Sequence, residues 1–212
     1  MKLYGYWRST AAYRVRIALQ LKSLPYQSCP VHLINNGGEQ HSDAYIKLNP
    51  TQLVPTLVDG DIKIRQSLAI IDYLEHKYPD VSLYPDNLVD KALVQALAYD
   101  VACEIHPLNN LRVQQYLTQQ LAVDEQQKSA WVHHWITLGF EAFETQLKQT
   151  AGKYCVGDEI SLADICLVPQ VYNANRVNLA MQAYPLIQRV VGQCQQHPAF
   201  IAAQPENQAD AQ

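Results

Sequence analysis

Residues 2–21 read KLYGYWRSTAAYRVRIALQL, and this stretch decides the fold. It predicts a short strand over residues 2–6, a loop over Trp7–Thr10 and a helix over residues 11–23. The helix carries apolar residues on two faces, as a helix buried on both sides does. A second strand is predicted over Tyr26–Leu33. A strand, a helix and a strand in this order favour a right-handed parallel crossover.

The residues that follow predict a hairpin and a further helix. Two β-type triplets within residues 56–64 flank Asp59-Gly60, which is a strong hairpin signal. Ser67 then caps a helix that runs through Tyr78. With a short helix over residues 42–48, the element order predicts a four-stranded mixed sheet with helices packed on it.

The composition changes near residue 80, beyond which almost every segment has a helical pattern. We therefore expect two domains, an α/β domain over residues 1–80 and an all-α bundle over residues 88–212. Prolines and aspartates in residues 78–86 indicate a linker between them. The polar tail from Pro205 is expected to be disordered. The helices of the bundle are predicted near residues 88–117, 125–149, 162–178, 184–196 and 198–202.

Composition excludes several classes of protein. The chain has 212 residues, of which 48% are hydrophobic, and its formal net charge is -4, which argues against a nucleic-acid binder. No apolar run approaches the ~20 residues that span a bilayer, and the strand-like start argues against a signal peptide. The five cysteines lack Cys-x-x-Cys spacing, as reduced thiols of a cytoplasmic protein do. His133-His134 lacks the i, i+4 spacing of a metal helix, so we expect no metal.

Hydroxyl side chains stand where the first helix begins. Ser9 and Thr10 lie between a strand and a helix, where unpaired N–H groups and the helix dipole favour an anion. A hydroxyl at this place can donate a hydrogen bond to a thiolate. The alternative is a plain N-cap, which Ser and Thr often provide.

Two further places could bind a peptide-like ligand. Pro55 starts a predicted strand, and a cis bond after Val54 would leave the Val54 backbone free to pair with an extended peptide; most X-Pro bonds, however, are trans. Gln66-Ser67 opens a helix whose N–H groups and hydroxyl could hold a carboxylate, or could serve only as a cap.

Arginines and a kinked segment supply the remaining candidates. Arg8 lies beside Ser9, and Arg176 ends a predicted helix. A lone arginine is usually a solvated or paired surface residue. These two become candidate ligands if the substrate is anionic, because guanidinium groups match carboxylates. His106 and Asn110 surround Pro107, which we expect to kink its helix.

Several strings together resemble the zeta class of glutathione transferases, from residue 2 to about residue 200. They are YWRSTAAYRVRIAL at 6–19, NP at 49–50, VPTL at 54–57, QSLAII at 66–71, YCVGDE at 154–159 and ADICLVPQV at 163–171. The resemblance implies a thioredoxin-like N-terminal domain, an all-helical C-terminal domain, a homodimer and glutathione as cofactor.

The resemblance also implies roles for individual residues. The peptide Val54-Pro55 is expected to be cis, with the cysteine of glutathione against the Val54 backbone. The γ-glutamyl carboxylate is expected at Gln66-Ser67 and the glycine end near Gln40. Ser9 corresponds to the serine that activates the thiol, with Thr10 beside it, and Arg176 to the arginine that binds a substrate carboxylate.

The sequence departs from the family at one triplet, which usually reads Ser-Ser-Cys and here reads Ser9-Thr10-Ala11. Glutathione itself supplies the thiolate, so we expect the loss of this cysteine to be tolerated. His106, Asn110 and Arg112 resemble a bacterial branch that isomerises maleylpyruvate.

The implied activity is the cis–trans isomerisation of maleylacetoacetate to fumarylacetoacetate, a step of tyrosine and phenylalanine catabolism in the cytoplasm. The thiolate would add reversibly to the double bond of this dicarboxylate, which Arg8 and Arg176 would hold, with help from His106 or Asn110. The alternatives are maleylpyruvate isomerisation, general glutathione conjugation, and a non-catalytic module of the same fold. Ser9, Val54-Pro55 and Gln66-Ser67 argue together against the last.

Overall fold

A mixed sheet of four strands organises the first part of the chain, in the order β2-β1-β3-β4. The computed structural model describes residues 1–212. Strand β1 pairs in parallel with β2 and antiparallel with β3, which pairs antiparallel with β4, so the predicted crossover and hairpin are both confirmed. The strands are β1 Lys2–Gly5, β2 Gln27–Pro30, β3 Thr56–Asp59 and β4 Ile62–Arg65.

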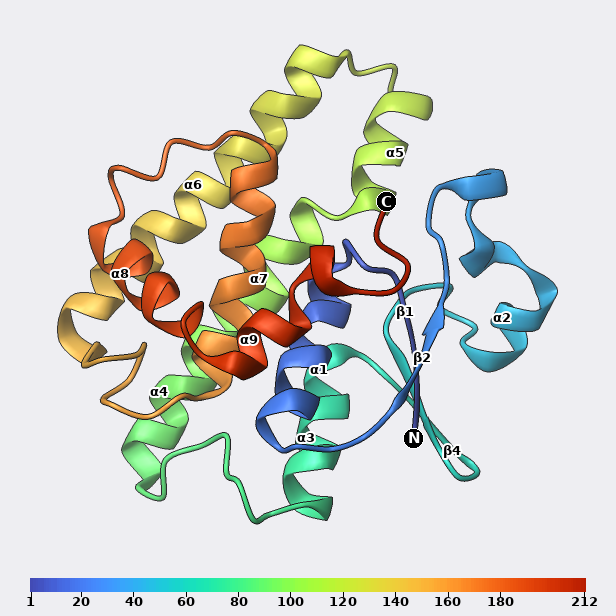
Figure 1. Ribbon diagram of the computed structural model, residues 1–212. Coiled ribbons are helices and arrows are strands. Elements are labelled where there is room, and N and C mark those ends of the chain that lie inside the picture. The colour runs from blue at the N-terminus through green and yellow to red at the C-terminus, as the bar shows by residue number, and fades with distance from the viewer. The chain divides into compact units, whose positions relative to one another are not determined.

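Three helices accompany the sheet: α1 Thr10–Leu21, α2 Asp43–Leu48 and α3 Ser67–Lys77. Figure 1 shows α1 and α3 on one side of the strands and α2 on the other. Every residue of α1 from Thr10 to Leu19 is buried, as its two apolar faces predict. Strand β2 is shorter than the predicted Tyr26–Leu33, because its partner β1 ends at Gly5, whose carbonyl accepts from the Val31 N–H at 2.7 Å.

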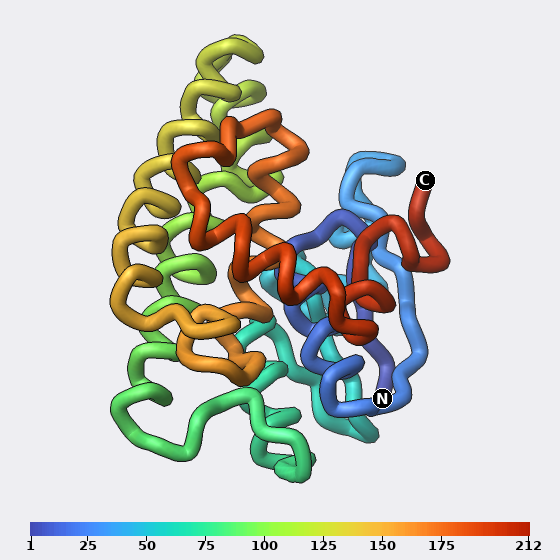
Figure 2. The backbone as a smooth tube through the Cα atoms, turned by 60° about the vertical axis from the view of Figure 1, so that its left-hand side comes forward, coloured from blue at the N-terminus to red at the C-terminus, as the bar shows by residue number.

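The chain forms two compact units, Met1–Ser82 with Gln196–Gln212, and Leu83–Gln195. The last segment therefore belongs to the unit that holds the sheet. Helix α9, Pro198–Ala203, packs against α1, and Figure 2 shows the C-terminal segment (red) running past the first part of the chain (blue), with the two termini apart. The expectation of a disordered tail from Pro205 was wrong, because Pro205 is buried and the residues after it form hydrogen bonds with the same unit.

The second unit is helical throughout. Its long helix α6 lies against α5 and α8, and α7 packs between α4 and α8. Every residue from Leu162 to Val171 in α7 is buried, so this helix forms the core. The helices are α4 Leu88–Tyr99, α5 Leu111–Gln119, α6 Glu125–Thr150, α7 Leu162–Arg176 and α8 Pro185–Cys194.

The single helix predicted near residues 88–117 was wrong. Helix α4 ends at Tyr99 and is followed by a π-helical segment, Asp100–Ile105, and a 3-10 turn, His106–Leu108. The predicted kink at Pro107 is present, and it divides the segment because proline cannot donate the helical hydrogen bond. A new helix, α5, then begins after Asn110.

A buried carboxylate fixes the start of α7. Asp164 is 0% exposed and accepts hydrogen bonds at 2.9 Å from the N–H and the hydroxyl of Ser161 and from the N–H of Cys155. These bonds form a capping box at the start of α7. Burial raises the pKa of Asp164, although these hydrogen bonds act in the opposite direction.

Candidate active site

Ser9 is the N-cap of α1. Its Oγ accepts a hydrogen bond from the Ala12 N–H at 3.2 Å, and its carbonyl accepts one from the Tyr13 N–H at 2.8 Å. The cap and the chemical role are compatible, because accepting one bond leaves the hydroxyl proton free to be donated. The half-buried Ser9 side chain thus offers a donor at the positive end of a helix dipole.

The neighbours of Ser9 differ in exposure. Thr10 is buried and is the first residue of α1, whereas Arg8 is exposed. The guanidinium carbon of Arg8 lies 4.2 Å from the centroid of the Trp7 ring, so a cation–π contact orients this arginine. Ala11, at the position of the missing cysteine, is buried in the packed face of the helix.

The Val54-Pro55 peptide is cis, as the resemblance implies. No hydrogen bond from the chain reaches the N–H or the C=O of Val54, although the next strand begins two residues later. The preceding carbonyl, of Leu53, accepts from the Asn49 amide at 2.8 Å and the Tyr45 hydroxyl at 2.7 Å. Asn49 therefore holds this segment in place, a role that its position in the Asn49-Pro50 string did not reveal.

Gln66 and Ser67 stand at the start of α3. Gln66 has a φ of 70° and is exposed, and no side chain caps the first N–H groups of the helix. The prediction that Ser67 is the cap was wrong: it is the first helical residue, and its hydroxyl accepts from Arg14 at 3.3 Å. Arg14 is only 1% exposed, so a buried cation lies next to this helix end. Open N–H groups and a nearby cation suit a carboxylate.

Gln40 lies in a short 3-10 turn and is only 5% exposed. Its Nε2 is 3.4 Å from the Leu33 carbonyl oxygen and 3.0 Å from Nε2 of His41, while its Oε1 is buried without a hydrogen-bond partner. The open group of Gln40 is an acceptor and suits an N–H of a ligand. A carboxylate would instead need the donor Nε2 at this place. Rotating the side-chain amide of Gln40 by half a turn exchanges Oε1 and Nε2 and puts the donor there.

The sheet brings three of these places together at one end of its strands. Tyr4 in β1 pairs with Thr56 in β3, and Thr56 pairs with Arg65 in β4. The loop that leads to Ser9, the residue Val54 and the dipeptide Gln66-Ser67 each lie just beyond these paired positions, at the same end of the strands. A hydroxyl that can donate a hydrogen bond to a thiolate, an unpaired backbone segment and a site for a carboxylate together fit a small acidic peptide with a thiol, such as glutathione.

The second unit contains the remaining candidates. Asn110 caps α5 by accepting from the Val113 N–H at 3.1 Å. Its neighbour Asn109 is buried, and its Oδ1 accepts from the Asn173 amide at 2.9 Å. The bond between Asn109 and Asn173 holds the turn at residues 106–110 beside the last turn of α7, and sequence patterns did not reveal it.

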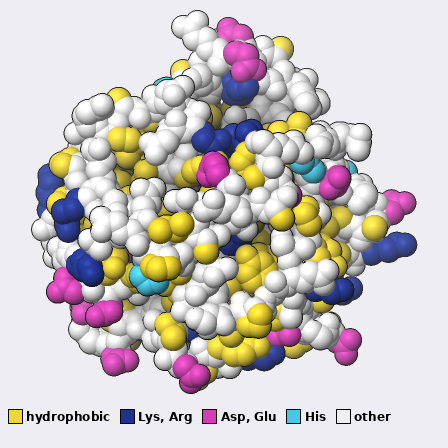
Figure 3. All heavy atoms as spheres, in the orientation of Figure 1, with side chains coloured by type: hydrophobic (Ala, Val, Ile, Leu, Met, Phe, Trp, Pro, Cys, Tyr) yellow, Lys and Arg dark blue, Asp and Glu magenta, His cyan; other side chains and the backbone are white.

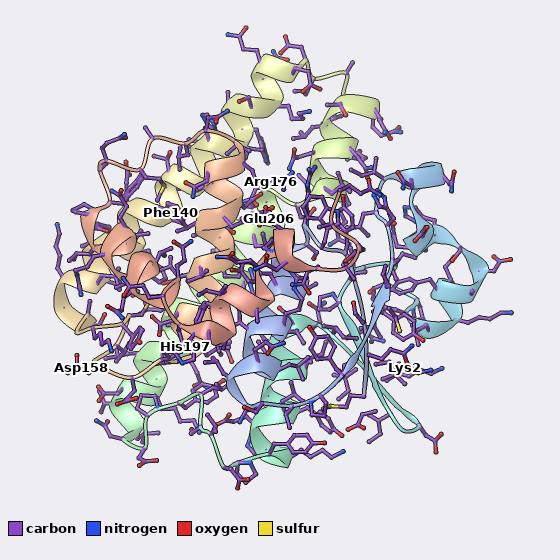
Figure 4. The ribbon with its side chains drawn as sticks, viewed as in Figure 1. Lys2, Phe140, Asp158, Arg176, His197 and Glu206 are labelled. Atoms are coloured by element: carbon purple, nitrogen blue, oxygen red, sulfur yellow. The ribbon has the colours of Figure 1, made fainter.

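Arg176 ends α7, one helical turn after Asn173, and is exposed (Figure 4). Within this unit, His106, Asn110 and Arg176 therefore lie at the same end of α7. Arg112 is exposed in the first turn of α5. No carboxylate pairs with Arg176, so its guanidinium group is available to an anion.

Charged side chains of both signs are interspersed over the face drawn in Figure 3, without a continuous basic stripe. None of the helices is both long enough and apolar enough to cross a lipid bilayer.

Comparison with known proteins agrees with this arrangement. The family profile described as "Glutathione S-transferase, N-terminal domain" matches residues 3–82, and that of the "Glutathione S-transferase, C-terminal domain" matches residues 136–198. The chain is 53% identical to a probable maleylacetoacetate isomerase of Vibrio cholerae, over 99% of this chain and 97% of the relative.

Two of the similar solved structures align with this chain over the full length of both chains. One is the holo structure of a maleylpyruvate isomerase, described as a bacterial glutathione S-transferase of the zeta class, with a TM-score of 0.97 and 43% identity. The other is a maleylacetoacetate isomerase from Methylobacterium extorquens AM1 with bound malonate and glutathione, with a TM-score of 0.96 and 35% identity. The chain therefore belongs to the glutathione S-transferase family, within its zeta class.

Proposed function

We propose that this protein uses glutathione to isomerise maleylacetoacetate to fumarylacetoacetate, in the cytoplasmic breakdown of tyrosine and phenylalanine. The observation that carries the proposal is the Ser9 hydroxyl, which caps α1 and keeps its proton free beside an exposed arginine. The similarity to maleylacetoacetate isomerases over nearly the full chain supports the same substrate.

The first unit is the proposed glutathione-binding domain. Ser9 donates to the sulfur, with Thr10 beside it, and the N-terminus of α1 favours negative charge there. The unpaired Val54 backbone matches a peptide, Gln66-Ser67 takes a carboxylate, and Gln40 contacts the other end. When bound, glutathione supplies a thiolate that adds reversibly to the cis double bond of the substrate.

The second unit is the proposed substrate-binding domain. Arg176 is an exposed cation at the end of a rigid, buried helix, which suits one carboxylate of a dicarboxylic acid. In the first unit, Arg8 is the corresponding cation, and stacking on Trp7 orients it. His106 and Asn110 are proposed to contact glutathione. The malonate in the Methylobacterium relative shows that a dicarboxylate binds that protein.

Maleylpyruvate is the second candidate substrate. The observation in its favour is the TM-score of 0.97 with a maleylpyruvate isomerase. Both acids present a cis double bond conjugated to a carbonyl, with carboxylates at the ends. The same residues would therefore serve either substrate.

An absorbance assay with both cis acids, with and without glutathione, tests the proposal. We expect glutathione-dependent turnover of both, with a higher kcat/KM for maleylacetoacetate. A higher kcat/KM for maleylpyruvate would reverse the order of the two candidates. Absence of glutathione-dependent turnover with either acid would contradict the isomerase assignment.

We also propose that the protein is a homodimer. Helix α4 exposes several large apolar side chains, among them Leu88 at 80% and Val89 at 68%. Such a concentration on one helix is typical of a surface that another chain covers. Sedimentation equilibrium should give twice the monomer mass, and Leu88→Glu should shift the protein toward the monomer. A monomeric wild-type protein would contradict the dimer.

A further inference from the structure

The last residues of the chain contact the loop that carries Arg8 and Ser9. Strand β1 ends at Gly5, so the backbone of Trp7 lies beyond the sheet and must find other partners. The Trp7 N–H donates to the Asp210 carboxylate at 3.1 Å, across 203 positions of sequence. The Trp7 side chain is buried as well, so this contact lies in a packed region.

The carbonyl of Trp7 is also hydrogen-bonded, through Arg16, to the C-terminal segment. It accepts from Nη2 of Arg16 at 3.0 Å, and Nε of the same guanidinium group donates at 3.0 Å to the carbonyl of Ala203. Arg16 is buried, and its fixed fork joins the loop to the end of α9. Both backbone polar groups of Trp7 thus depend, directly or through Arg16, on residues 203–210.

The C-terminal segment is itself held in one conformation. The Gln208 amide donates to the carbonyls of Gln204 at 2.7 Å and Ala202 at 3.0 Å, and the Asn207 amide donates to that of Ile201 at 2.7 Å. Pro205, two residues after the end of α9, is buried in the same unit. The Asp210 carboxylate is therefore presented at a defined place by an ordered support.

We propose that residues 203–210 position the active-site loop, with Asp210 and Arg16 as positioning residues for Arg8 and Ser9. This inference rests on the function proposed above. Arg8 stacks on the ring of Trp7, so a shift of Trp7 displaces the guanidinium group that awaits a carboxylate. The Ser9 N–H donates to the Tyr6 carbonyl at 2.9 Å, so the loop moves as a unit.

Asp210→Ala tests the proposal, with two measurements on the full-length protein. By NMR, the Trp7 amide should exchange with solvent at least about tenfold faster in the ligand-free variant, because its acceptor is gone. In the isomerase assay, the KM for the dicarboxylate should rise about tenfold, with a smaller change in kcat, because a misplaced Arg8 weakens binding.

Two further variants separate positioning from general loss of structure. Asp210→Asn keeps an amide oxygen that can accept from Trp7, so it should restore most of the protection and most of the affinity. Asp61→Ala removes an exposed carboxylate of the same unit, in the turn between β3 and β4, which makes no bond to the loop or to residues 203–210. Its Trp7 exchange rate and its KM should equal those of the wild type.

Unchanged Trp7 exchange and unchanged KM in Asp210→Ala would overturn the inference, as would equal effects of Asp210→Ala and Asp61→Ala. An inactive wild-type protein would instead contradict the proposed function. The exchange measurement needs no substrate, so the contact between Asp210 and Trp7 is tested in either case.

Discussion

The Oγ of Ser9 lies 3.2 Å from the backbone N–H of Ala12, from which it accepts a hydrogen bond. This contact fixes the direction of the hydroxyl at the start of α1 and leaves one proton to donate. The same serine thereby stabilises the helix and is proposed to donate to a bound thiolate, and the two effects can be separated by mutation.

Ser9→Ala should reduce isomerase turnover by about 10²- to 10³-fold, as removal of one preorganised donor does. It should also cost about 1 kcal/mol of folding stability through loss of the cap. Steady-state kinetics and urea unfolding measure the two effects. Ser42→Ala is the matched control, because Ser42 caps α2 in the same way, accepting from the Tyr45 N–H at 3.3 Å. Equal turnover in the two variants would show that Ser9 takes no part in the reaction.

Arg176→Ala should mainly raise the KM for the dicarboxylate, by about tenfold, because a charge-assisted hydrogen bond to a carboxylate is lost. Its control is Arg189→Ala, which removes another exposed arginine of the second unit, bound to the Gly152 carbonyl. An unchanged KM in Arg176→Ala would show that the substrate carboxylate binds elsewhere.

Asn173→Ala should loosen the turn at residues 106–110, because the Oδ1 of buried Asn109 loses its donor. We expect a loss of about 1 kcal/mol in stability and a several-fold weaker affinity for glutathione, through His106 and Asn110. Calorimetric titration measures the affinity. Gln188→Ala, which loses an exposed bond to the Met181 carbonyl, is the comparison and should bind glutathione normally.

Acid should weaken the fold partly through Asp59. Its carboxylate accepts from Lys77 at 2.5 Å and Tyr73 at 2.9 Å, and these donors hold the pKa of Asp59 below its usual value. Because the folded state has the lower pKa, this stabilisation is complete above the ordinary pKa of ~3.9 and is lost as the pH falls through the folded value. Urea unfolding should show Asp59→Asn less stable than wild type at neutral pH, with the difference vanishing in acid. A difference that does not change with pH would contradict this assignment.

Local patterns predicted much of the fold. The hairpin around Asp59-Gly60, the buried helix after Ser9 and the end of α7 at Arg176 all follow from turn chemistry and apolar periodicity. These features depend on residues that are close in sequence. The kink at Pro107 is of the same kind, since proline alone removes the helical hydrogen bond.

Features that depend on distant partners were not predictable in this way. Ser67 looks like a cap in sequence, but its hydroxyl accepts from Arg14, 53 positions away. The tail after Pro205 has a polar, disorder-like composition, yet Asp210 binds the N–H of Trp7. In each case a long-range contact outweighs the local propensity, and only the folded chain shows it.

The central claim is that Ser9 and the N-terminus of α1 stabilise a thiolate, and the pKa of the thiol of bound glutathione tests it most directly. Ultraviolet absorbance of the thiolate, followed against pH in the binary complex, gives this value. We expect a pKa well below the ~8.5 of a free thiol in the wild type, returning toward that value in Ser9→Ala. A wild-type complex whose thiol titrates like free glutathione would contradict the account.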